Sequence, residues 1–399
     1  MTMAAASPPR GWLFAWSIAL APMLLIAIGW GHELSQAQRF ARSYALPIVA
    51  VELAIAIVAF VETRRFPRLP LFPTALLLLL GAVAFYSAAR APAAATSLFM
   101  TLLWVNHLAF GLGIYMLARH GLLTAPQVIR AMPFGFALFA AVLIAYFMLH
   151  SGHGHRWYYD SPPFNNIRWL GYHCAAIFGL CAWGWLENRR VFLIIAIFAL
   201  AFALWTGSRG SLAAVVGGYV AALLFVPAAA RATPRFVGAL LLAVLLALAA
   251  ALIWPLGEGS TDRLFLDQGD SGRREIWRQT VSVIGQSPWF GWGEAQFGTL
   301  LGSRFAQPHN IVLQILLAWG AVGFGLLAVL AALLANRLRR NANRQNAPLI
   351  FAICNIAAFS LIDGSLFHIH SVSVFALCAA LLAADEGSAV DGERSAGFM

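Results

Sequence analysis

Long apolar segments separated by short polar stretches recur along the whole chain. A helix that crosses the hydrocarbon core of a bilayer needs about 20 mostly apolar residues. The pattern predicts about twelve spanning helices, at 12–30, 44–61, 71–88, 97–117, 131–149, 168–186, 191–206, 211–228, 235–254, 309–335, 348–364 and 367–384. The expected fold is therefore all-α, a polytopic integral membrane protein with a single transmembrane domain over residues 1–399.

Placement of the arginines predicts the orientation, because positively charged residues favour cytoplasmic loops. With the N-terminus inside, the inner side holds the larger set: Arg10, Arg64, Arg65, Arg68, Arg119, Arg130, Arg189, Arg190, Arg231, Arg235, Arg337, Arg339, Arg340 and Arg344. The outer short loops and helix mouths hold a smaller set: Arg39, Arg42, Arg90, Arg156, Arg168 and Arg209. The bias predicts cytoplasmic N- and C-termini, in a bacterial inner membrane whose outer side faces the periplasm.

On this topology, residues 255–308 form one large periplasmic loop, and residues 385–399 form a polar, disordered cytoplasmic tail. Within the loop, the pattern from Gly272 to Ile284 predicts a helix. The following turn, 287–293, contains three aromatic residues, which suit either a membrane interface or stacking on sugars.

The composition supports a lipid environment and makes nucleic acid a poor partner. Hydrophobic residues make up 61% of the chain and charged residues 11%, against about half and a quarter in soluble domains. The net charge is +10, and membrane topology explains the position of the arginines better than nucleic-acid binding does. The sequence contains no lysine, so all 26 residues of the combined lysine and arginine count are arginines. Any anion site must therefore use guanidinium groups, which suit phosphate.

Four arginines at helix mouths on the predicted outer side form the first candidate site. An arginine there is costly unless it has a partner or water. Taken singly, any of these arginines could be an interface anchor or a salt-bridge partner; they are Arg168, Arg209, Arg273 and Arg274. As a group placed against the positive-inside bias, they indicate a site for a multiply charged anion such as a diphosphate.

His309 is the second candidate, at the outer mouth of the span that follows the long loop. Histidine is the side chain best able to take a proton near neutral pH, although a lone histidine at a helix mouth is more often an interface or capping residue. Asp363, His368 and His370, near the last hairpin, are explained about as well by helix capping as by a role toward an acceptor.

No metal or cofactor is expected, because no Asp-x-Asp or clustered acidic and histidine set appears on the predicted outer side. His150, His153 and His155 are interpreted as solvated loop residues. A transporter would require charged residues deep within spans and internal repeats. The charges are instead expected at helix mouths, and no repeat is evident.

Several short motifs together resemble the bacterial O-antigen ligase family. His309-Asn310, nine further residues and then Gly320-Ala321-Val322-Gly323 are similar to its signature. Other pieces follow the same order: Asn166-Ile167-Arg168, Ser208-Arg209-Gly210, Gly272-Arg273 with Trp277, and Gly291-Trp292-Gly293 with Phe297. The resemblance covers roughly 165–325.

The resemblance implies a metal-independent, inverting glycosyltransferase. Such a ligase moves a glycan from undecaprenyl diphosphate to a sugar hydroxyl of lipid A-core, and so also contacts membrane lipid. It implies His309 as general base and Arg209 and Arg273 as ligands of the diphosphate, with Arg168 and Arg274 secondary.

A polymerase of O-antigen or exopolysaccharide remains an alternative, because Arg274, ten residues and Gly285 resemble a spacing in such proteins. A polymerase would use the same lipid carrier but a carrier-linked glycan as acceptor. A transferase of glycans to protein is a further alternative.

Overall fold

A computed structural model describes residues 9–30, 34–64, 69–150, 166–253, 272–302 and 307–385. All the regular elements in these ranges are helices: α1 (Pro9–Ile28), α2 (Gln36–Ser43), α3 (Leu46–Thr63), α4 (Leu71–Ala89), α5 (Ala94–Arg119), α6 (Ala125–His150), η1 (Ile167–Trp169), α8 (Leu170–Leu180), α9 (Trp183–Leu186), α10 (Arg190–Trp205), α11 (Arg209–Leu223), η2 (Pro227–Ala232), α12 (Thr233–Ile253), α14 (Arg273–Ile284), α15 (Phe297–Leu301), α16 (Ile311–Arg340), α17 (Ala347–Asp363), η3 (Ser365–Phe367) and α18 (Ile369–Asp385). The all-helical prediction is confirmed for the described part of the chain.

Seven helices in the described ranges are long and apolar enough to cross a membrane. They are 10–28, 46–63, 71–89, 94–119, 125–149, 227–253 and 311–340. The other five predicted spans correspond to shorter apolar helices, at 170–186, 190–205, 209–223, 347–363 and 369–385. The chain is a multi-pass membrane protein, whereas the number of twelve spans stays a prediction.

The predicted span 168–186 corresponds to the shorter apolar stretch 170–186, which has an interruption. It begins as the 3₁₀ turn η1 and divides between Leu180 and Trp183 into α8 and α9. Gly179 at the end of α8 lies so close to α17 that a Cβ there would come within 2.5 Å of the Ala352 nitrogen. The last turn of α8 is therefore fixed by close packing against α17.

Small residues allow the other helices to pack closely as well. A Cβ on Gly113 of α5 would lie 3.0 Å from Ala56 of α3, and one on Gly135 of α6 would lie 2.7 Å from Ala19 of α1. Lipid is as apolar as leucine, so helices in a bilayer associate through such close packing. Large apolar side chains instead cover the outside, as with Leu252 of α12, which is 81% exposed.

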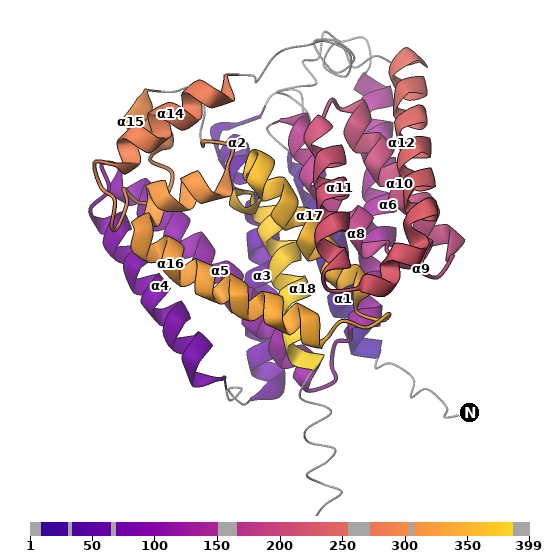
Figure 1. The fold of residues 1–399 in the computed structure, drawn as a ribbon, viewed down its shortest axis with the longest axis horizontal. Helices are drawn as coiled ribbons and strands as arrows, with labels where there is room; N and C mark the ends of the chain where they lie inside the picture. Colours follow the sequence, from indigo (N-terminus) through magenta and orange to yellow (C-terminus); the bar gives the residue numbers. More distant parts are fainter. Residues whose placement is uncertain are drawn as a thin grey trace, which may run out of the picture.

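Helices α17 and α18 lie in the middle of the bundle (Figure 1). Helix α17 packs against α8, α11 and α18, and α18 also packs against α5. Helices α14 and α15 lie at one end of the bundle, at the upper left of Figure 1, and α18 runs toward the opposite end. The first end is called the α14 end below.

A polar cluster within the bundle contradicts the expectation that charges lie only at helix mouths. Glu52 of α3 is 2% exposed, and its carboxylate contacts His107 of α5 at 2.8 Å through Nδ1. Asn106 donates to Glu52 at 2.8 Å, and the Ser373 hydroxyl of α18 also donates to it. A buried carboxylate is tolerated only when paired and hydrogen-bonded, and partners on α5 and α18 meet this requirement.

Helix α16 is broken at Gly320, where the backbone has φ 64° and ψ −167°. The loop 288–293 supplies hydrogen bonds on both sides of the break. Ala321 N donates to Pro288 O at 2.8 Å, and Gly293 N donates to Ala318 O at 2.9 Å. The loop after α14 is therefore built into α16, which fixes α14 at the start of that helix.

The same loop carries a buried acid. Glu294 is 1% exposed and is hydrogen-bonded by the side chains of Trp104 and Gln314. Burial raises the pKa of Glu294 to about 7 despite these donors, which lower it. The loop thus contacts α5 as well as α16.

The predicted loop helix from Gly272 to Ile284 is confirmed as α14. Other predictions fall outside the described residues: the tail at 386–399, His153 and His155, and the rest of the large loop at 254–271 and 303–306.

Candidate functional site

His309, Asp363 and Arg273 meet at the α14 end of the bundle. The Nδ1 atom of His309 lies 2.6 Å from Oδ1 of Asp363, and the Arg273 guanidinium lies 3.6 Å from the same oxygen. The three side chains are 26%, 22% and 34% exposed, respectively. The group is therefore partly buried and still open to a substrate.

Contacts on both neighbours hold His309 in place. Trp277 of α14 donates from Nε1 to Pro308 O at 2.9 Å, and Asn310 donates from Nδ2 to Leu361 O at 3.0 Å. Asn310 also caps α16, because its side-chain oxygen accepts from two backbone N–H groups of the first turn. His309 itself has a φ of 54°, a region that ordinary residues adopt at some cost and that is enriched at functional sites.

Asp363 is placed by the end of α17. Gly364 follows it with a φ of 65° and ends the helix. The Tyr172 hydroxyl of α8 contacts Asp363 O at 3.4 Å. Gln307, two residues before His309, contacts His368 through their Nε2 atoms at 3.1 Å, so the segment before α16 and the connection after α17 are tied together.

Arg273 is the first residue of α14, directly after Gly272, whose φ is 76°. Arg274 is exposed beside it. Arg278, one turn on, pairs with Glu275 at 2.6 Å and, through this hydrogen bond, holds the pKa of Glu275 below its ordinary value. This turn thus carries three arginines and one glutamate, and of these Arg274, Glu275 and Arg278 are exposed.

The two remaining predicted arginines lie on neighbouring elements. Arg209 begins α11 and is exposed, and the next residue, Gly210, lies against Phe359, one turn before Asp363 on α17. Arg168 lies in η1, and its side chain is outside the described residues. Trp169, the next residue, contacts His368 in a tilted arrangement, with ring centroids 4.4 Å apart and 47° between the ring planes.

The structure thus brings together two of the predicted residues, His309 and Arg273, because both contact Asp363. The sequence left the role of Asp363 open. Asp363 contacts both, and capping of α17 does not require its side chain, because Gly364 ends the helix. The available signal was an acid at the end of an apolar span. The diphosphate role of Arg209, Arg274 and Arg168 stays a prediction.

The geometry suits proton transfer. When Nδ1–H of a neutral imidazole donates to a carboxylate, Nε2 carries the lone pair, and the carboxylate stabilises the imidazolium that forms on protonation. His309 and Asp363 have this arrangement. A cation next to the pair, here Arg273, can stabilise an anion that develops beside it.

Comparisons with known proteins agree with the motifs. Residues 194–328 match the model of a family described as O-antigen ligase. An O-antigen ligase from Pseudomonas aeruginosa is 30% identical over 196 residues, which covers 45% of this chain and 45% of that protein. The family match includes Arg209, Arg273, Arg274 and His309, and it ends before Asp363. The resemblance inferred from the motifs is confirmed over this part of the chain.

Proposed function

We propose that this chain, whose residues 194–328 match the O-antigen ligase family, transfers a glycan from undecaprenyl diphosphate to a sugar hydroxyl of lipid A-core. The observation that carries the proposal is the contact of His309 with Asp363, next to Arg273, at one end of a membrane bundle. These groups match the two demands of the reaction, a base for the acceptor and cations for the leaving diphosphate.

His309 acts as general base. As the acceptor oxygen attacks the anomeric carbon, its O–H bond breaks and the proton passes to Nε2 of His309. The bond from the anomeric carbon to the diphosphate oxygen breaks, and its electron pair leaves with the diphosphate. Asp363 orients the imidazole and stabilises its charge. Direct displacement inverts the anomeric centre.

Arg273 and Arg209 bind the diphosphate, with Arg274 and Arg168 in secondary roles. Fixed cations stabilise the charge that develops on the leaving group. The 3.6 Å contact of Arg273 with Asp363 leaves further N–H donors of the guanidinium to face a phosphate. The reaction proceeds without a metal, because the diphosphate is a good leaving group and the charge is carried by arginine.

The site faces the periplasm of a bacterial inner membrane, and both termini lie in the cytoplasm. The excess of arginine in the predicted inner loops supports this orientation. With this orientation, carrier-linked glycans and lipid A-core can both reach the site from the outer leaflet.

An in vitro transfer assay tests the proposal. Purified wild-type protein and His309→Ala would receive an undecaprenyl-diphosphate glycan and lipid A-core in the presence of EDTA. His120→Ala is a matched control, because His120 is an exposed residue at the end of α5, hydrogen-bonded to Met116 O.

We expect transfer by wild type and His120→Ala and not by His309→Ala. Near-normal transfer by His309→Ala would exclude the base assignment. Lengthening of the carrier-linked glycan, with lipid A-core unmodified, would identify a polymerase. This is the alternative hypothesis, and the spacing of Arg274 and Gly285 supports it.

A further inference from the structure

An exposed aromatic surface lies at the α14 end, on the loop that follows α14. Trp289 is 67% exposed and Phe290 is 36% exposed. Tyr86, near the end of α4, is 47% exposed, and its ring meets that of Phe290 edge-on with centroids 5.1 Å apart. The exposed Arg90 donates from Nη1 to the Tyr86 hydroxyl at 3.0 Å, and its guanidinium lies 5.3 Å from the centroid of that ring. These four residues are called the aromatic platform below.

The backbone that carries the platform is fixed on two sides. The Ser87 hydroxyl of α4 donates to Phe290 O, and Val322 N of α16 donates to Trp289 O at 3.1 Å. Gly320 packs so closely on this loop that a Cβ there would lie 2.3 Å from the carbonyl carbon of Trp289. Large aromatic rings are thus held on the surface by a rigid backbone.

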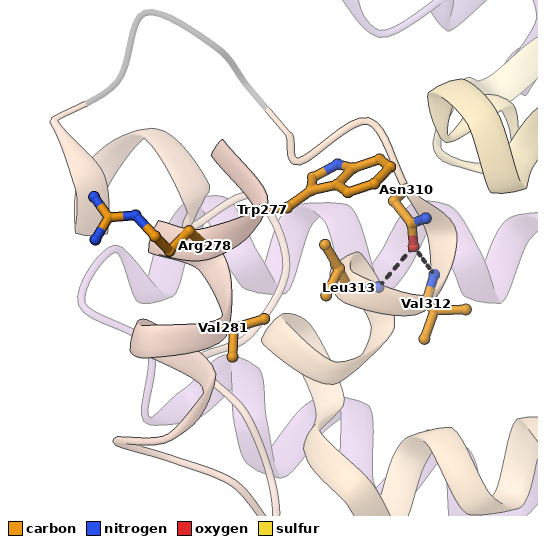
Figure 2. Close-up of a pocket in the computed structure, with 6 residues that line it drawn as sticks. All are labelled: Trp277, Arg278, Val281, Asn310, Val312 and Leu313. Atoms are coloured by element: carbon orange, nitrogen blue, oxygen red, sulfur yellow. Dashed lines mark hydrogen bonds between the residues drawn. The ribbon is translucent and has the colours of Figure 1, made fainter. Parts of the chain in front are cut away.

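Helix α16 connects the platform to His309. Asn310 caps its first turn by accepting hydrogen bonds from Val312 N and Leu313 N, which are drawn as dashed lines in Figure 2. From this cap the helix runs to its break at Gly320, where the platform loop is attached. At about 1.5 Å per residue, this segment is roughly 14 Å long. An extended ligand can therefore contact the platform at one end and reach His309 with the other.

The chemistry of the platform matches an anionic sugar. The C–H groups on one face of a sugar ring pack on the face of an aromatic ring, and this stacking requires rings in fixed positions. Aromatic residues that only anchor a protein at the membrane interface face mobile headgroups and need no such fixation. A guanidinium has five N–H donors, so Arg90 keeps donors for a phosphate or carboxylate on the sugar.

We propose that the aromatic platform binds an anionic sugar of the acceptor glycolipid while the acceptor hydroxyl lies at His309. The inference rests on the proposed function, in which the acceptor is lipid A-core. Trp289 stacks on the sugar ring, and Arg90 binds its anionic group. The platform therefore determines the affinity for the acceptor and takes no part in binding the donor or in moving the proton.

A binding experiment tests the platform without turnover. The probe is lipid A-core from which the acyl chains have been removed, added to full-length protein in nanodiscs. Trp289→Ala should raise the Kd of this probe about tenfold. Trp30→Ala is the matched control, because Trp30 is an exposed aromatic residue just after α1, 41% exposed, and it should leave the Kd unchanged.

The probe has no acyl chain, so the loss of a membrane anchor does not weaken its binding. An equal Kd for Trp289→Ala and wild type would overturn the proposal and identify the platform as an interface anchor. Trp289→Tyr, which keeps an aromatic face, should restore most of the affinity.

Arg90→Gln tests the anionic part of the ligand. Added NaCl should raise the Kd of wild type, because salt screens the attraction between Arg90 and the sugar. In Arg90→Gln the Kd at low salt should be about tenfold higher than in wild type and should respond less to NaCl. The same salt response in both proteins would exclude Arg90 as the contact.

Turnover separates the acceptor from the donor. Trp289→Ala should raise KM for lipid A-core about tenfold, with kcat and KM for the undecaprenyl-diphosphate glycan little changed. An effect on the donor KM alone would overturn the proposal. Failure of the proposed function looks different, because wild type would then transfer no glycan to lipid A-core. In that case the Kd of the deacylated probe still decides whether the platform binds its sugars.

Discussion

Removal of the Asp363 carboxylate should slow transfer while leaving the protein folded. In Asp363→Ala, His309 loses its 2.6 Å partner and Arg273 loses its 3.6 Å partner. A hydrogen bond to a charged group contributes about 1.5–3 kcal/mol. Because the His309 and Asp363 side chains are 26% and 22% exposed, solvent screening favours the lower part, about 1.5–2 kcal/mol. At about 1.4 kcal/mol per decade, kcat should fall roughly 10- to 30-fold.

The assay is the initial rate of glycan transfer at saturating donor. Asp363→Asn, whose amide oxygen still accepts a hydrogen bond, should lie between wild type and Asp363→Ala. His309→Ala should lose more, about 10²- to 10⁴-fold, since it removes the base itself.

The decisive comparison is the double variant. If Asp363 acts through His309, Asp363→Ala should have little further effect in the His309→Ala background, because residues that act as a unit are non-additive. A full 10- to 30-fold loss in that background, or a loss under about twofold in the wild-type background, would refute the positioning role.

Three further predictions concern stability, measured as thermal unfolding in detergent. Gly320→Ala should destabilise the protein by more than about 2 kcal/mol, because the φ of 64° and the backbone of Trp289 leave no room for a Cβ. Gly325→Ala is the control, because a Cβ there meets open space, and it should be neutral or slightly stabilising. Equal effects of the two substitutions would contradict the break in α16. Glu52→Ala should lower the free energy of unfolding by about 3–5 kcal/mol, because it leaves buried partners unpaired. Glu62→Ala removes an exposed pair with Arg10 and should lower it by less than about 1 kcal/mol. A mild effect of Glu52→Ala would show that the buried cluster is not needed for stability. Burial raises the pKa of Glu294 from 4.5 to about 7. Between these pH values the folded state holds a proton that the unfolded state has lost. The free energy of unfolding therefore falls as the pH rises, by about 3 kcal/mol in all. Glu294→Gln should flatten this slope and raise the Tm at pH 8, and an unchanged slope would argue against a protonated Glu294.

The sequence was sufficient for the parts of the fold that depend on local pattern. Helix α14 was predictable because Gly272 precedes an amphipathic segment of helical period. His309 and Arg273 were predictable because their short motifs occur in a recognisable order. In each case the information lies within a few neighbouring residues.

The rest depends on contacts between distant segments. Asp363 lies 54 residues after His309, and its position at a helix end is equally typical of a capping region. The run from Ile311 to Arg340 is apolar enough for one straight helix, and only the loop 288–293 makes the break at Gly320 favourable. Glu52 is visible in the sequence, but its partners on α5 and α18 are not.

The Glu52 cluster also has a consequence for the order of biosynthesis. Ser373, on α18, is synthesised 321 residues after Glu52, which at about 5–20 residues per second takes roughly 15–65 s. During that interval His107 is available to the carboxylate and α18 is not. Because an acidic residue within a spanning helix costs up to about 2.5–3.5 kcal/mol to insert, a nascent chain that still lacks α18 keeps an incompletely paired charge in the bilayer.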